Sequence, residues 1–176
     1  MMTGIPIENN LWTAYLLTIF FVVAGFAVYD VLYRRVPDRA LVFFIPLAAL
    51  APVLQGYFLL NHGLPPLFLW PVATHALVGA LLGFCIPLAA ALATNGTGLD
   101  GGDIKYCGIL GLVYGPSGMT LVFLTAAVTA MPVIFLLRRL YRTGQPLAIP
   151  FLPFLACGCC TATLAQLFLS LQIKSQ

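Results

Sequence analysis

Six apolar stretches, most of them about as long as a membrane-spanning helix, dominate this sequence. They run from Leu11 to Tyr29, Ala40 to Leu60, Pro71 to Ala93, Ile104 to Tyr114, Met119 to Leu137 and Ile149 to Leu171. All but the fourth approach the ~20 residues that an α-helix needs to cross the hydrocarbon core of a bilayer. Backbone N–H and C=O groups cannot stay unpaired in lipid, so such stretches form helices there. The pattern predicts an all-α fold, a polytopic membrane bundle of about six transmembrane helices with a short fourth helix.

The composition supports a membrane protein. Of the 176 residues, 61% are hydrophobic and only 7% are charged, and the mean hydropathy is +1.02. Ordinary soluble domains carry about 25% charged residues. No composition shift, internal repeat or long charged tail marks a linker. We therefore expect a single membrane-embedded domain over residues 1–176.

The fourth apolar stretch ends in "YGPSG", residues 114–118. Two glycines, a proline and a serine favour a turn over a continuous helix at this point. The turn separates the fourth stretch from the fifth and leaves the fourth helix short, tilted or partly re-entrant.

Basic residues gather on alternate loops. The arginines near the first and the last loop are Arg34, Arg35, Arg39, Arg138, Arg139 and Arg142. The loop "NHGLPP" has no Lys or Arg. Cytoplasmic loops collect Lys and Arg, so loops one, three and five are expected in the cytoplasm and both termini outside. We expect Arg34 and Arg35 to set this topology, and contacts of these arginines with anionic lipid or with a substrate stay open.

The net charge of +3 is too small and too localised to indicate a nucleic-acid partner.

Four of the five acidic residues lie near the predicted cytoplasmic boundary. Asp30 ends the first stretch, Asp38 lies in the loop that follows, and Asp100 and Asp103 precede the fourth stretch. Two carboxylates held close share a proton, so that one activates a water while the other polarises a scissile carbonyl. Since the topology brings Asp30 and Asp103 to the same edge of the bundle, we expect them to form the catalytic pair of an aspartyl protease.

The residues around Asp103 suggest further roles. Gly101 and Gly102 have no side chains, so a substrate strand can approach Asp103 closely. Lys105 is expected to extend toward the lipid headgroups or to stabilise negative charge on Asp103.

Structural explanations for the same residues stay open. Asp103, directly before an apolar helix, would serve as an N-cap. Asp30 would pair with Arg34 four residues later, or simply end the first helix. Cys157 and Cys160 have a C-x-x-C spacing, but no second cysteine pair and no nearby histidine accompanies them. We therefore predict neither a metal site nor a cofactor.

Three segments together resemble the type IV prepilin peptidases. "YDVLYRRVPDRAL", residues 29–41, resembles a first signature in which an aspartate at the end of the first helix is followed by basic residues and Ile-Pro-Asn. "GGDIKYCGILGLVYG", residues 101–115, resembles the G-x-G-D signature, and "AIPFLPFLACG", residues 148–158, resembles the proline-containing start of the last helix. The resemblance implies that Asp30 and Asp103 are catalytic. It further implies that a prepilin or pseudopilin substrate loses its positively charged leader at the cytoplasmic face of the bacterial inner membrane.

The chain also departs from the family pattern. Asp100 replaces the first glycine of G-x-G-D, and Asp38 replaces the asparagine after the proline. We expect Asp100 to point into the cytoplasm. Larger family members carry a cytoplasmic zinc-binding domain and methylate the new N-terminus, and this chain lacks that insertion. It resembles the short peptidase-only form of Flp/Tad-type pili, which leaves N-methylation and the oligomeric state open.

Two alternative functions remain at this stage. One is an intramembrane aspartyl protease of the presenilin or signal-peptide-peptidase kind, for which the chain is short. The other is a small proton-coupled transporter or assembly factor without enzymatic activity. A proton relay would place carboxylates at the bilayer centre, whereas the four beyond Glu8 lie at one edge.

Overall fold

The apolar stretches form helices in the computed structural model of the chain, which describes residues 5–33, 37–94, 100–140 and 151–173. The α-helices are α1 (Ile5–Tyr33), α2 (Asp38–Asn61), α3 (Leu69–Ala93), α4 (Gly101–Leu140) and α5 (Leu152–Ile173), and a short 3-10 helix, η1 (Pro66–Phe68), precedes α3. The described residues contain no strand. The predicted all-α fold is confirmed.

The helices have the length and surface of membrane spans. Among the described residues, four segments are long and apolar enough to cross a bilayer, namely Asn10–Tyr33, Asp38–Asn61, Pro66–Ala93 and Gly101–Leu136. The shorter apolar segment Leu152–Phe168 lies in α5. Large apolar side chains face outward, and Phe43 and Leu67 are each 80% exposed. So extensive an apolar surface is stable in lipid but not in water, and the protein is a multi-pass membrane protein.

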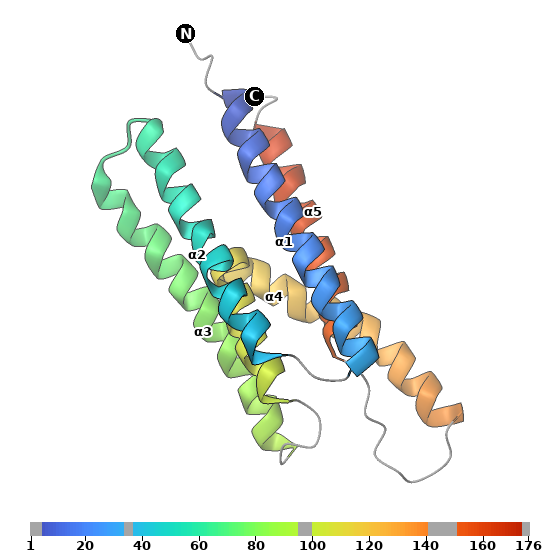
Figure 1. Cartoon of the computed structure of the whole chain (residues 1–176). Coiled ribbons are helices and arrows are strands. Elements are labelled where there is room, and N and C mark those ends of the chain that lie inside the picture. The colour runs from blue at the N-terminus through green and yellow to red at the C-terminus, as the bar shows by residue number, and fades with distance from the viewer. Residues whose placement is uncertain (1–4, 34–36, 95–99, 141–150, 174–176) are drawn as a thin grey trace.

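The count of six separate spans is not confirmed, because the fourth and fifth apolar stretches are two arms of α4. The arms comprise residues 101–114 and 116–140 and meet at Gly115, where φ is 65° and ψ is −175°. Only glycine adopts this backbone conformation readily. The turn predicted in "YGPSG" is therefore a sharp break at Gly115, and both arms run from it toward the same end of the bundle (Figure 1).

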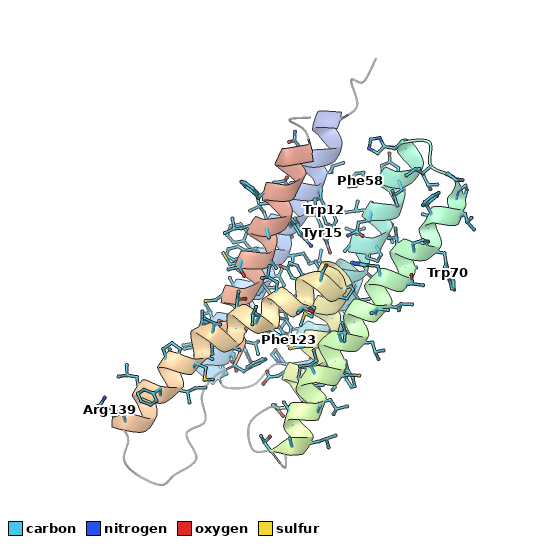
Figure 2. All side chains as sticks on the ribbon, turned by 180° about the vertical axis from the view of Figure 1, so that it is seen from behind. Trp12, Tyr15, Phe58, Trp70, Phe123 and Arg139 are labelled. Atoms are coloured by element: carbon cyan, nitrogen blue, oxygen red, sulfur yellow. The ribbon has the colours of Figure 1, made fainter. Side chains whose placement is uncertain are left out.

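The helix ends fall into two groups (Figure 1). The C-terminal ends of α1 and α3, the N-terminal ends of α2 and α5 and both ends of α4 lie at one end of the bundle, which we call the Asp30 end. Arg139 lies there, whereas Trp12 and Trp70 lie toward the opposite end (Figure 2). This grouping matches the topology inferred from the arginines, although Arg34, Arg35 and Arg142 lie outside the described residues. The side of the membrane that each end faces stays a prediction.

Glycines hold the first arm of α4 against α3. Gly79 lies one turn before Gly83 on α3, and Gly111 lies one turn before Gly115 on α4. A Cβ atom at Gly79 would collide with the carbonyl oxygen of Gly111, and one at Gly111 would collide with the carbonyl oxygen of Gly79. Small residues at this spacing allow membrane helices to approach closely. The packing fixes the first arm of α4, which begins two residues before Asp103.

A buried polar contact joins α4 to α5 near the break. The hydroxyls of Tyr114 and Thr163 lie 2.9 Å apart and are both buried. Such a contact is worth about 0.6 kcal/mol on average between membrane helices. It helps to hold α5 beside the two arms of α4, with its N-terminal end near Asp30.

Candidate active site

Asp30 and Asp103 are the only buried acidic side chains among the residues whose burial the structure describes, with exposed fractions of 5% and 8%. Asp30 lies in the last turn of α1, and Asp103 is the third residue of α4. The two carboxyl groups are close enough to interact electrostatically. The fold thus brings together the two residues that were expected to form a pair.

The carboxylate of Asp30 is held by the start of α5. Its Oδ2 atom accepts a hydrogen bond from the main-chain N–H of Leu152 at 3.1 Å, in a buried contact. Leu152 is the first residue of α5, and the first N–H groups of a helix have no partner within it. Asp30 lies close to the end of the first helix, as one alternative held, and α1 continues for three more residues to Tyr33. A pairing with Arg34 falls outside the described residues.

Asp100, rather than Asp103, occupies the capping position of α4. The Oδ1 atom of Asp100 accepts a hydrogen bond from the N–H of Gly101 at 2.8 Å, and its carbonyl oxygen accepts one from the N–H of Asp103 at 3.1 Å. Asp103 reaches back, with its Oδ2 atom 3.4 Å from the N atom of Asp100, as in a capping box. The N-cap role considered for Asp103 is therefore wrong, because the N-cap is Asp100, three residues earlier. Asp100 is exposed.

The two glycines before Asp103 differ in exposure. Gly101 is exposed, and a Cβ atom there would meet nothing within 4 Å. Gly102 is buried. The open space at Gly101 agrees with the predicted approach of a substrate strand, and that role stays a prediction for both glycines.

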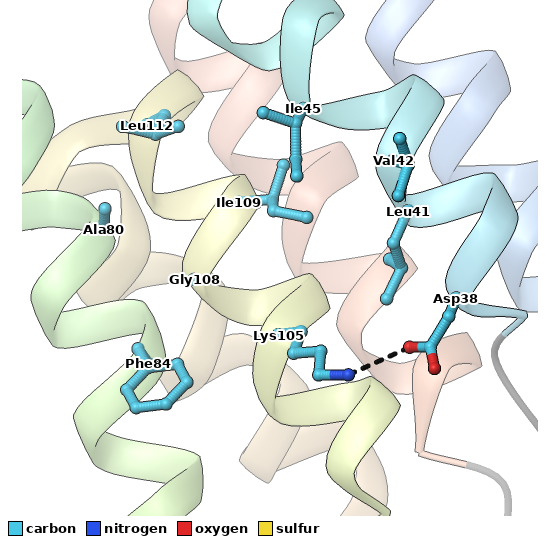
Figure 3. Close-up of a pocket in the computed structure, with 10 residues that line it drawn as sticks. All are labelled: Asp38, Leu41, Val42, Ile45, Ala80, Phe84, Lys105, Gly108, Ile109 and Leu112. Carbon is cyan, nitrogen blue, oxygen red and sulfur yellow. Dashed lines mark hydrogen bonds and ion pairs between the residues drawn. The ribbon is translucent and has the colours of Figure 1, made fainter.

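Lys105 lies on a different face of α4. Its Nζ atom is 3.0 Å from Oδ1 of Asp38 in α2. Figure 3 shows this ion pair at one end of an apolar pocket between α2, α3 and the first arm of α4. The pocket has a volume of about 470 Å³ and is lined also by Leu41, Val42, Ile45, Ala80, Phe84, Gly108, Ile109 and Leu112. Lys105 therefore pairs with Asp38. The expectation that it would stabilise negative charge on Asp103 is not supported by this contact.

An aromatic and thiol layer lies next to the two carboxyl groups. The ring of Tyr106, one turn after Asp103, lies 5.0 Å from that of Phe26 and 5.6 Å from that of Phe44, measured between centroids. Cys107 and Cys159 are fully buried. The side chains of this layer are buried, and charge interactions are stronger where water is excluded. The sequence does carry a signal for this neighbour, since residues three apart on a helix share a face and Tyr106 follows Asp103 at that spacing.

The geometry suits acid–base chemistry on a water molecule. Asp30 and Asp103 are both buried and interact electrostatically. Where two carboxyl groups share a proton, one can accept a proton from water while the other donates a hydrogen bond. Within the part of the chain that the structure describes, no group of three or more His, Cys, Asp or Glu residues is arranged to hold a metal ion.

Comparison with known proteins adds an independent finding. The type IV leader peptidase family matches residues 11–135. A Bacillus subtilis (strain 168) protein described as "Prepilin leader peptidase/N-methyltransferase" is 32% identical over 136 residues, which cover 75% of this chain and 48% of that protein. The chain thus spans about half the length of this curated relative. No solved structure matches the chain.

Proposed function

Because the chain belongs to the type IV leader peptidase family, we propose that it is a membrane aspartyl endopeptidase that removes the positively charged leader from prepilin-like proteins. The observation that carries this proposal is the buried carboxylate pair of Asp30 and Asp103 at one end of the bundle. The curated relative is named for leader cleavage and for methyl transfer. Our proposal takes only the first of these activities.

The proposed reaction is hydrolysis of one peptide bond. The ionised member of the pair accepts a proton from water, and the water oxygen attacks the scissile carbonyl carbon. The protonated member donates a hydrogen bond to the carbonyl oxygen and stabilises the developing negative charge. Collapse of the tetrahedral intermediate breaks the C–N bond, a proton passes to the leaving amine, and one product carries a new carboxyl group. No cofactor takes part.

The position of the pair fits a cut near the membrane surface. Asp30, Asp38, Asp100 and Asp103 all belong to helix ends at the Asp30 end of the bundle. Arg139 is at that end too (Figure 2), and basic residues favour the cytoplasmic side. We propose that this end faces the cytoplasm from the bacterial inner membrane, where the leader of a prepilin or pseudopilin would remain.

The test is cleavage of a prepilin by the purified protein in lipid vesicles. We expect Asp30→Asn and Asp103→Asn each to lower the cleavage rate at least about 100-fold, as for loss of a general acid or base. Cys85→Ser, at an exposed position on α3, is the control and should cleave at the parental rate. Gel mobility reports cleavage, and circular dichroism reports folding.

The other functions give different results in the same vesicles. N-terminal sequencing of the product identifies the bond that is cut. A cut inside the apolar segment would indicate a protease of the presenilin kind. Proton flux that depends on the carboxylates, without any cleavage, would indicate a transporter. Cleavage that survives both asparagine substitutions would refute the catalytic pair.

A further inference from the structure

The N-terminal end of α5 is the third part of the chain that reaches the carboxylate pair. Its first residue, Leu152, donates its main-chain N–H to Oδ2 of Asp30 across a sequence separation of 122 residues. The side chain of Leu152 is 1% exposed and belongs to the core. Packing of the Leu152 side chain in the core therefore holds the main-chain amide of Leu152 in place.

The contact also suits the charges of the two helix ends. Asp30 lies in the last turn of α1, where the partial negative charge of the helix dipole disfavours a carboxylate. The first turn of α5 carries the opposite partial charge and favours one. The amide of Leu152 therefore offsets an unfavourable position for Asp30 within its own helix.

The donor is held in a fixed direction. Pro153 follows Leu152, and proline fits the first turn of a helix because its φ is already helical and it needs no N–H there. The N–H of Leu155 donates to the carbonyl oxygen of Phe151 at 3.3 Å and closes this turn. A backbone donor in a closed turn has less freedom than a flexible side chain would have. It can thus hold a carboxylate in one orientation.

We propose that the main-chain amide of Leu152 is a positioning group for Asp30, which orients the carboxylate beside Asp103 and stabilises negative charge on it. The proposal rests on the peptidase function proposed above. It gives a role to a segment that lies beyond the residues matched by the family, 11–135. Asp103 has a comparable but longer contact, because its Oδ2 atom lies 3.4 Å from the N atom of Asp100. Each carboxyl group therefore contacts a main-chain N atom at the start of a helix, α5 for Asp30 and α4 for Asp103.

The direct test replaces Leu152 with its α-hydroxy acid analogue in the full-length protein, which exchanges the N–H for oxygen and keeps the side chain. With a prepilin substrate in lipid vesicles, we expect kcat to fall about 10- to 100-fold, the usual effect of losing a hydrogen bond to a charged group. KM should change less than about twofold, because the amide acts on Asp30 and not on substrate binding.

The matched control is the same exchange at Leu155. An ester at position 152 also weakens the Phe151 carbonyl as an acceptor, and an ester at 155 removes the donor of that same helix bond. We expect the Leu155 ester to keep the parental kcat. Equal losses of kcat in the two esters would show a purely structural effect and overturn the proposal.

Encoded substitutions provide a second measurement. Leu152→Pro removes the N–H at the first residue of the helix, where proline is common, whereas Leu152→Ala keeps the N–H and removes the buried side chain. We expect Leu152→Pro to lower kcat more than Leu152→Ala does. A parental kcat in the Leu152 ester would overturn the positioning role. If Asp30→Asn and Asp103→Asn were inactive in the same assay, the peptidase proposal would still stand. Cleavage by those two variants would refute both proposals.

Discussion

Asp103 and Lys105 are two residues apart on the first arm of α4, yet they form opposite kinds of pair. Asp103 lies within electrostatic reach of Asp30, and both residues are buried. Lys105 forms an ion pair with Asp38, and these side chains are 58% and 75% exposed. Residues two apart on an α-helix point in nearly opposite directions. One face of the arm therefore carries the candidate chemistry, and the other faces the apolar pocket.

The two pairs also differ in their expected effect on stability. An exposed ion pair contributes roughly 0 to 1 kcal/mol. A buried pair of carboxyl groups that interact unfavourably when both are ionised opposes folding, and such groups are retained mainly where function needs them. The carboxyl pair of Asp30 and Asp103 therefore has no evident benefit for stability, and this makes it the better candidate for catalysis than the ion pair of Lys105 and Asp38.

The sharpest test of this contrast is Asp103→Asn. Cleavage should fall at least about 100-fold, because a catalytic carboxyl group is lost. The thermal unfolding temperature in detergent should stay the same or rise, since the repulsion with Asp30 disappears and an amide oxygen still reaches the Asp100 N–H. An Asp103→Asn protein that unfolds at a clearly lower temperature would show that the carboxylate is structural.

Gly115→Ala would disturb the arm that carries both pairs. The backbone conformation at Gly115 costs a residue with a Cβ atom roughly 1–3 kcal/mol, and the Cβ atom would also meet the ring of His75. We expect a lower unfolding temperature together with slower cleavage. An unchanged unfolding temperature would argue against the sharp break between the two arms.

Gly111→Ala tests the glycine contact that fixes the arm against α3. The added methyl group would collide with the main chain at Gly79, and overpacking of this kind typically costs about 1–3 kcal/mol. Gly25→Ala on α1 is the matched control, because a Cβ atom there meets nothing within 4 Å. Thermal unfolding should distinguish the two, with Gly111→Ala lower and Gly25→Ala close to the parental protein.

Lys105→Gln should have the smallest effect. The exposed ion pair with Asp38 is worth less than about 1 kcal/mol, so the unfolding temperature should hardly change. Cleavage should stay within a few-fold of the parental rate, because Lys105 lies away from the carboxylate pair. A loss comparable to that of Asp103→Asn would show that the two faces of the arm act together.

Much of the candidate site was predictable because its signals are local. Asp30 and Asp103 stood out as acidic residues at the edges of apolar stretches, and the arginines predicted which helix ends lie together. The Gly-Pro-Ser-Gly sequence predicted a turn, and Gly115 supplies it. The helix boundaries were less accurate, since α1 extends past Asp30 to Tyr33 and α4 begins at Gly101. These errors hid the capping role of Asp100.

The contact between Leu152 and Asp30 could not be predicted in this way. A main-chain N–H is present at almost every residue, so no residue type marks the one that donates. The pairing of Lys105 with Asp38 was missed for a related reason. Its partner depends on which face of α4 packs toward α2, and the apolar pattern of a membrane helix is too uniform to show that face.

The sequence by itself determined that the chain is helical and membrane-embedded, where α4 breaks, and which acidic residues lie at one edge of the bundle. These features follow from hydrophobicity, glycine conformation and charge, which act over one or two helical turns. Only the tertiary structure decided that Asp30 and Asp103 are buried within electrostatic reach of each other, that Lys105 pairs with Asp38, and that α5 supplies an amide to Asp30. The last two of these contacts join residues 67 and 122 positions apart, and they exist only where the packing of the whole bundle brings the helix ends together.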